Sequence, residues 1–94
     1  MLPLRDVLRF TASEGLVYAH TASGTPIADY TLSELEARTA GAFVRVSRAD
    51  LVNLSHVQRI VSNGDGSATL TLSDGTSVRV SRRRSADVRH LLAG

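Results

Sequence analysis

The sequence predicts a mostly β fold with two short helices at its edges, and three observations support this prediction. Several segments alternate apolar and polar residues with a period of two, which is typical of strands with one buried and one solvated face. Turns rich in Gly, Asn and Ser separate these segments. Only two segments carry helix signals, a capping box near residue 31 and an apolar helical spacing near residue 90.

The N-terminal part is predicted to form a three-stranded meander. Its strands cover residues 7–12, 16–21 and 25–28. A loop at Ser13, Glu14 and Gly15 reverses the chain after the first strand, and a turn at residues 22–24 reverses it again. The sequence therefore places short antiparallel strands next to one another at the start of the fold.

The first helix is predicted from a capping box. The Thr31 hydroxyl can accept a hydrogen bond from the backbone N–H three residues on, and Glu34 can accept one from the N–H of Thr31 in return. Leu32 and Leu35 then share one face of a short helix, which we expect to end before Gly41.

The pentapeptide Val-Arg-Val-Ser-Arg occurs twice, at residues 44–48 and 78–82. In each copy the valines should face a core and the arginine between them should face solvent. The first copy predicts a strand at residues 43–47 with Arg45 exposed, followed by a helical turn at 48–53 in which Asn53 is a turn or cap residue. The valines expected to be buried are Val44, Val46, Val78 and Val80, and we expect the two copies to lie close together.

The remaining strands are predicted at residues 57–62, 68–72 and 77–80, with turns at 63–66 and 73–75. Ser81 is a candidate N-cap for a second helix. Val88, Leu91 and Leu92 follow the spacing of an amphipathic helix, which we expect to end at Gly94.

The composition of the chain excludes several classes of protein and site. The chain has 94 residues, and we expect residues 1–94 to form a single domain. It lacks cysteine, which excludes disulfides and thiolate metal sites, and no apolar run is long enough to span a membrane. The start of the chain does not resemble a signal peptide, so we expect a cytoplasmic protein. The three histidines lie on separate predicted elements, so we expect no metal site and no cofactor; His20 is expected to be a hydrogen-bonded structural residue.

No arrangement of residues indicates an enzyme, and the arginines carry the remaining chemistry. All 11 basic residues are arginine. Residues 43–94 hold eight arginines against four acids, whereas residues 1–42 hold three against five. Arg82, Arg83 and Arg84 stand at a predicted helix start, where N–H groups already favour an anion. Each observation also has an explanation that does not involve a ligand. The all-arginine composition could reflect a GC-rich genome, and Arg82–Arg84 could be a solvated charge run. Arg48 could form a surface ion pair with Asp50.

Residues 43–57, from Phe43-Val44-Arg45-Val46-Ser47-Arg48 through Leu51-Val52-Asn53, closely resemble the central motif of the LytTR (LytR/AlgR-type) DNA-binding domain. A second motif of that family is similar to Asp74-Gly75-Thr76 followed by Val80-Ser81-Arg82-Arg83. The resemblance covers residues 3–93 and also includes the opening Pro3-Leu4 and the helix at Leu32–Glu36. Three places depart from the family pattern: Ser47 replaces a His, Asp50 replaces an aromatic residue, and Glu14-Gly15-Leu16 lacks the usual Asn and aromatic residue.

The resemblance implies an elongated stack of small antiparallel sheets that reaches DNA through loops. It implies an output domain of a bacterial response regulator that binds a repeated promoter element, with a second copy on the DNA and a receiver or sensor domain elsewhere in the full-length protein. By resemblance, Arg48 and Arg83 would contact bases, and Ser81, Arg82, Arg84 and Ser85 would lie near phosphates. The implied contact residues are Ser13, Glu14, Gly15, Arg48, Ala49, Ser81, Arg82, Arg83, Arg84 and Ser85.

Two other functions are compatible with the sequence. The chain could be a small β protein-interaction module whose arginine-rich face binds an acidic partner. A non-specific RNA binder is a weaker alternative because few aromatic residues are available to stack on bases. Arginines that gather on one face without acids among them would favour DNA.

Overall fold

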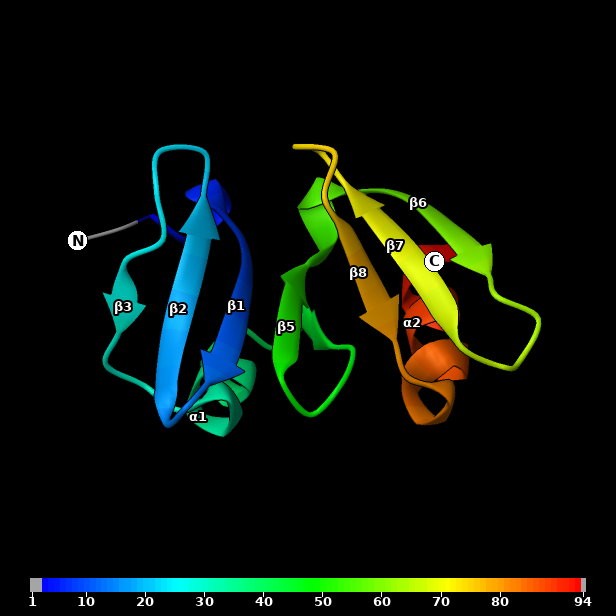
Figure 1. Cartoon of the computed structure of the whole chain (residues 1–94), viewed down its shortest axis with the longest axis horizontal. Coiled ribbons are helices and arrows are strands. Elements are labelled where there is room, and N and C mark those ends of the chain that lie inside the picture. The colour runs from blue at the N-terminus through cyan, green and yellow to red at the C-terminus, as the bar shows by residue number, and fades with distance from the viewer. Residues whose placement is uncertain (1–2, 94) are drawn as a thin grey trace.

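The computed structural model describes residues 3–93 and shows two antiparallel sheets with two α-helices packed against them (Figure 1). The molecule is elongated, with extents of 38 × 23 × 23 Å. This confirms the predicted fold class. The elements are η1 (Leu4–Asp6), β1 (Val7–Ser13), β2 (Leu16–Thr21), β3 (Ile27–Ala28), α1 (Leu32–Arg38), β4 (Phe43–Arg45), β5 (Asp50–Asn53), η2 (Leu54–His56), β6 (Val57–Ser62), β7 (Ala68–Leu72), β8 (Ser77–Val80) and α2 (Arg82–Ala93).

The larger sheet has five strands in the order β3-β2-β1-β5-β4, and the smaller has three in the order β6-β7-β8. The predicted N-terminal meander is present as β1, β2 and β3. The predicted strands β6, β7 and β8 also pair in sequence order. Strand β5 joins the meander to β4 because it pairs with β1 on one side and with β4 on the other.

Two apolar cores hold these layers together. One lies between the larger sheet and α1, and includes Phe10, Leu35 and Leu51. The other lies between the two sheets and α2, and its buried residues are Leu8, Val46, Val52, Ala68, Leu70, Leu72, Val78, Val80 and Val88. The second core therefore draws side chains from both sheets, so neither sheet is packed independently of the other.

The two Val-Arg-Val-Ser-Arg copies meet in this second core. Val46 and Val80 have no exposed surface and Val78 is 4% exposed, which confirms their predicted burial. The backbone N–H of Ser81 donates to the carbonyl of Val46 at 2.9 Å, so the ends of the two copies are bonded directly. The prediction that they lie close together is confirmed; Val44 is only partly buried at the rim of the core.

The capping box of α1 forms as predicted. Thr31 Oγ1 accepts from the Glu34 N–H at 3.1 Å, and Glu34 Oε1 accepts from the Thr31 N–H at 2.9 Å. The Thr31 backbone N–H first, and the Thr31 hydroxyl second, hold the pKa of the Glu34 carboxyl below its ordinary value. Leu32 and Leu35 are buried, and the helix ends at Arg38, before Gly41.

The predicted helical turn at residues 48–53 is wrong. Residues 50–53 are strand β5, an interior strand of the larger sheet that lies between β1 and β4. Leu51 and Val52 are both fully buried because the two faces of β5 contribute to different cores. A strand buried on both faces lacks the alternation from which strands are predicted. Asn53 is a cap residue as expected: its side chain accepts from the Ser55 N–H and donates to the carbonyl of Val7.

Three strand boundaries also differ from prediction. Strand β3 begins at Ile27 rather than residue 25, because Pro26 has no N–H to pair. Strand β4 ends at Arg45, and residues 46–49 form the loop to β5. Strand β1 continues through Ser13, which shortens the reversal to two residues. The expected helix end at Gly94 lies outside the described residues.

Candidate nucleic-acid interface

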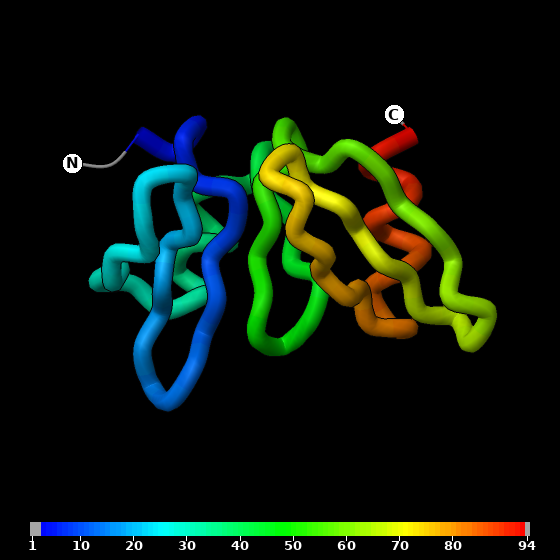
Figure 2. The backbone as a smooth tube through the Cα atoms, turned by 45° about the horizontal axis from the view of Figure 1, so that its top comes forward, coloured from blue at the N-terminus to red at the C-terminus, as the bar shows by residue number. Residues whose placement is uncertain are grey.

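Three chain reversals lie along one edge of the molecule. They are the β1–β2 turn, the β4–β5 loop and the β8–α2 junction, and Figures 1 and 2 both show them at the lower edge, spaced along the long axis. All ten implied contact residues fall in these three segments, which we call the loop edge. The β1–β2 turn holds Ser13, Glu14 and Gly15, the β4–β5 loop holds Arg48 and Ala49, and the β8–α2 junction holds residues 81–85.

The β1–β2 turn is a tight hairpin. Ser13 pairs with Leu16, which leaves Glu14 and Gly15 as the two central residues. Their φ angles are 52° and 81°, and positive φ at both positions is the signature of a type I′ turn. All four residues are exposed, so this tip stands free in solvent.

The Arg48 side chain is exposed in the β4–β5 loop. Within residues 3–93 its guanidinium makes no ion pair, and the interpretation that it pairs with Asp50 is wrong. Asp50 instead binds Arg9 at 2.8 Å across the β1–β5 pairing. Arg48 is therefore available to an external anion.

Arg45 does not face solvent, contrary to prediction. Its side chain is only 15% exposed and forms a clamp on the β4–β5 loop. Nε donates to the carbonyl of Ser47 at 3.0 Å and Nη2 donates to the carbonyl of Arg48 at 2.8 Å. Nη1 pairs with Glu36 Oε1 on α1 at 3.1 Å. The alternation of the motif could not reveal this role, because the side chain turns back onto its own loop.

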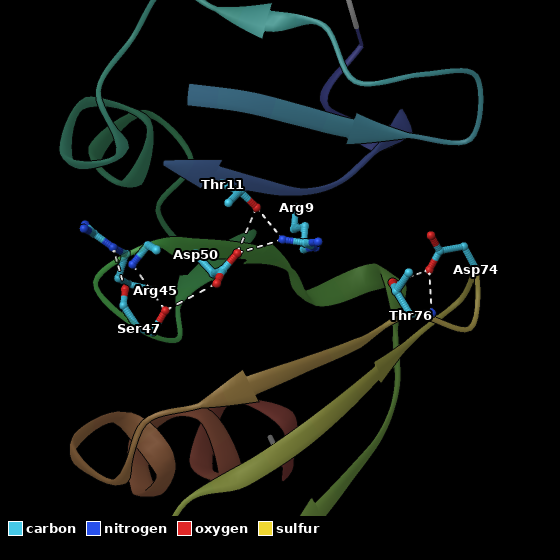
Figure 3. A network of polar contacts seen from close by, with 8 residues as sticks. Arg9, Thr11, Arg45, Ser47, Asp50, Asp74 and Thr76 are labelled. Carbon is cyan, nitrogen blue, oxygen red and sulfur yellow. Dashed lines mark hydrogen bonds and ion pairs between the residues drawn. The ribbon is translucent and has the colours of Figure 1, made fainter. Parts of the chain in front are cut away.

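A second set of contacts supports the other side of the same loop (Figure 3). Asp50 Oδ1 accepts from Arg9 Nη1 at 2.8 Å and from Thr11 Oγ1 at 2.9 Å, and Arg9 also donates to Thr11. Ser47 Oγ donates to Asp50 Oδ2 at 3.4 Å and accepts from the Ala49 N–H at 3.3 Å. Ser47 and Asp50, two of the residues that depart from the family pattern, are thus hydrogen-bonded to each other, and Arg9 offsets the charge of Asp50.

His20 lies beside this network but forms no hydrogen bond with its described residues. Its Nε2 is buried without a hydrogen-bond partner among the described residues, which contradicts the expected hydrogen-bonded histidine. Burial first, and the nearby Arg9 cation second, lower the pKa of His20. The described part of the chain contains no cluster of three or more acidic or histidine residues able to hold a metal ion.

At the β8–α2 junction the arginines differ in exposure. Ser81 immediately precedes α2, and Arg82 and Arg83 are exposed in its first turn. Arg84 is half-buried and lines a groove of about 430 Å³ with Glu36, Asp87 and His90.

Two further contacts define this end of the loop edge. The stem of Arg82 lies over the β6–β7 turn, where a Cβ at Gly66 would come within 3.2 Å of Arg82 Cδ. Ser85, also in the first turn of α2, is only 7% exposed. Between residues 3 and 93, none of Arg82, Arg83 and Arg84 is in an ion pair.

The acids near the loop edge are mostly engaged elsewhere. Asp50 is bound by Arg9, Glu36 by Arg45, and Asp65 lies 3.8 Å from Arg79. Hydrogen bonds from Ser67 hold the pKa of Asp65 below its ordinary value. Glu14, at the far end of the edge, carries an exposed carboxylate. Arg48, Arg82 and Arg83 therefore present positive charge along one edge, and no acid among residues 3–93 is bonded to them.

Replacing Arg45 should loosen the loop before it unfolds the domain. We expect Arg45→Ala to lower the free energy of unfolding by about 1–3 kcal/mol, because two carbonyls and Glu36 lose a charged donor. Backbone amides of residues 46–49 should exchange faster with deuterium. Arg45→Lys is the matched control: it keeps the charge beside Glu36 but cannot hold both carbonyls. Unchanged exchange in Arg45→Ala would show that the clamp does not order the loop.

Comparison with known proteins agrees with this geometry. The family model described as "LytTr DNA-binding domain" matches residues 1–93. The positive alginate biosynthesis regulatory protein of Pseudomonas aeruginosa is 34% identical over 94 residues, covering 98% of this chain and 38% of that protein. The transcriptional regulatory protein BtsR of Escherichia coli K12 is 37% identical over 84 residues, covering 88% of this chain and 34% of that protein. The chain thus spans little more than a third of the length of these relatives.

The fold has a close counterpart among solved structures. A LytTr DNA-binding domain of a putative methyl-accepting/DNA response regulator from Bacillus cereus superposes with a TM-score of 0.91 at 26% identity, covering 99% of this chain and 86% of that one. Among residues 3–93 there is no helix with the length and apolar character needed to cross a membrane. With a family model matched over nearly its whole length, relatives above 30% identity and the same fold, the chain belongs to the LytTR family of DNA-binding domains, which are not enzymes.

Proposed function

We propose that this domain recognises a specific sequence in double-stranded DNA by inserting the loop edge into successive grooves. The observation that carries the proposal is the alignment of three reversals on one edge, with Arg48, Arg82 and Arg83 unpaired within residues 3–93. The molecule is 38 Å long, and one turn of B-DNA is about 34–36 Å. Loops spaced along that length can therefore reach more than one groove on one side of a duplex.

The roles proposed for the residues follow their position and exposure. Arg48 and Arg83 are exposed, and an arginine can donate two hydrogen bonds to a guanine edge, so we assign them base contacts. We place Ser81, Arg82 and Arg84 near phosphates, where the free N–H groups at the start of α2 add to the attraction.

The other proposed contact residues would contribute by placing the backbone near the duplex and not through charged side chains. Ser85 is buried, so its part is to seat the first turn of α2 beside the phosphates. Ser13, Gly15 and Ala49 bring their backbone close to the duplex. No cofactor takes part in this mode of binding.

We further propose that residues 1–94 work as one binding unit of a longer regulator. The core shared by both sheets supports a single unit. The matched segment covers 38% and 34% of the relatives named as regulators, which leaves room for a receiver or sensor domain. By analogy with them we expect the protein to act in the bacterial cytoplasm as a transcription regulator, with two copies on a repeated promoter element.

The direct test is selection of bound duplexes from a random pool with the purified domain. We expect enrichment of one short motif, repeated when two copies bind together. An arginine-rich module for acidic proteins would enrich no motif and would bind polyglutamate as well as it binds DNA. That result would refute sequence-specific recognition.

Arg83 and Arg82 provide a matched test of base reading against phosphate binding. Both are exposed neighbours and each substitution removes one charge. Arg83→Ala should cost about 1–3 kcal/mol on the selected site and relax preference at one base position. Arg82→Ala should weaken selected and scrambled duplexes by the same factor, and Arg84→Ala should behave likewise. Binding isotherms on both duplexes decide the matter: equal losses for Arg83→Ala would remove its base-reading role.

A further inference from the structure

The first of the two central residues of the β1–β2 turn is a glutamate in a backbone conformation that glutamate disfavours. Glu14 has a φ of 52° and is the only non-glycine residue with positive φ in the described chain, residues 3–93. In a type I′ turn this position is ordinarily occupied by Asn, Asp or Gly. A longer side chain there costs folding energy and persists where something else favours it.

Nothing within the described structure accounts for the glutamate. Its side chain is exposed, and among residues 3–93 its carboxylate takes part in no ion pair. The turn itself is closed by the Ser13–Leu16 pairing, which needs no side chain at residue 14. The strain is therefore unexplained by the fold, and an unexplained strained residue at a binding edge points to function.

The position of Glu14 determines what it can contact. The β1–β2 turn that holds Glu14 lies at one end of the loop edge, on the same edge as the β4–β5 loop and the β8–α2 junction (Figure 2). A carboxylate at that edge would be repelled by phosphates, and it can only accept hydrogen bonds. In the major groove guanine and thymine present acceptors, and adenine presents an acceptor beside its amino group, whereas cytosine presents only its N4 amino donor.

We propose that Glu14 is a specificity-determining residue that accepts a hydrogen bond from the N4 amino group of a cytosine in the major groove. The inference rests on the proposed function and adds the base read by the β1–β2 turn. It also predicts that a substitution suited to the turn at residue 14 removes the backbone strain and does not destabilise the fold. Glu14→Asn should raise the melting temperature, because Asn suits the turn, while preference for cytosine at one position is lost.

The test combines base and side-chain changes on the duplex selected by the wild-type domain. Replacing the contacted cytosine by 2-pyrimidinone, which lacks the amino group, should weaken wild-type binding about tenfold. The same replacement should change binding by Glu14→Ala less than about twofold, because the acceptor is already gone. Glu14→Gln keeps the length of the side chain and removes its charge. This variant should keep the base preferences that Arg48 and Arg83 determine.

Two results would overturn the proposal. If Glu14→Gln binds every duplex more tightly with unchanged preferences, the carboxylate only repels phosphates. If the position affected by Glu14 selects a base other than cytosine, the proposed contact is wrong. A wild-type domain that enriches no motif would instead refute the proposed function, so the two failures are distinguishable.

Discussion

Val46→Asp is expected to abolish cooperative folding. Val46 has no exposed surface and lies in the core shared by both sheets and α2. An unpaired carboxylate there costs several kcal/mol, and a domain of this size is stable by about 5–14 kcal/mol in total. Urea unfolding followed by circular dichroism should show no native baseline, or a midpoint moved close to zero denaturant.

A matched surface control separates burial from the introduced charge. Val61 lies on β6 and is 46% exposed, so Val61→Asp should change the free energy of unfolding by less than about 0.5 kcal/mol. If Val46→Asp unfolds at the same urea concentration as Val61→Asp, then Val46 does not belong to the core that joins the sheets.

Binding of the selected duplex is expected to weaken steeply with salt. If about four to six phosphates are neutralised, the slope of log K against log salt is roughly −4 to −5. Affinity should then fall roughly 250- to 1,000-fold between 50 and 200 mM salt. The exposed arginines of the loop edge should account for most of this salt dependence, because neutral N–H groups release fewer counterions.

The slope also reports which arginines take part. Arg82→Ala should make it shallower by about one. Arg5 is exposed in η1, the segment directly before β1, and Figure 1 shows that segment at the edge opposite the loop edge. Arg5→Ala should therefore leave the slope unchanged. A salt-independent affinity would contradict phosphate contacts and favour a mainly apolar protein interface.

Local signals in the sequence predicted most of the fold. Alternation located strands β1, β2, β6, β7 and β8, and the Thr31–Glu34 pair located the start of α1. Strand β5 was missed because it is buried on both faces and short, so that its four residues carry no periodic signal. Its partners β1 and β4 come from different parts of the chain, and such pairing leaves no trace in local pattern.

The candidate site was predicted in part. Motif resemblance implied contact residues in three segments, and the structure brings these segments to one edge; that these residues contact DNA stays a prediction. Sequence reasoning could not see that Arg45 turns back onto the loop, because alternation reports the face of a strand and not the path of a long side chain. The pairing of Asp50 with Arg9 was likewise hidden, since 41 residues separate them.

The bond between the Ser81 N–H and the Val46 carbonyl has a consequence for the DNA. It fastens the backbone beside Arg82 to the backbone two residues before Arg48, and Val46, one of the two attachment points, is buried in the shared core. The offset between these two arginines is therefore a fixed property of the protein. A duplex whose grooves do not match that offset must twist or bend to fit, and the cost depends on the stiffness of its sequence. Base pairs that no side chain touches, between the two contact points, would in this way influence which sites are bound.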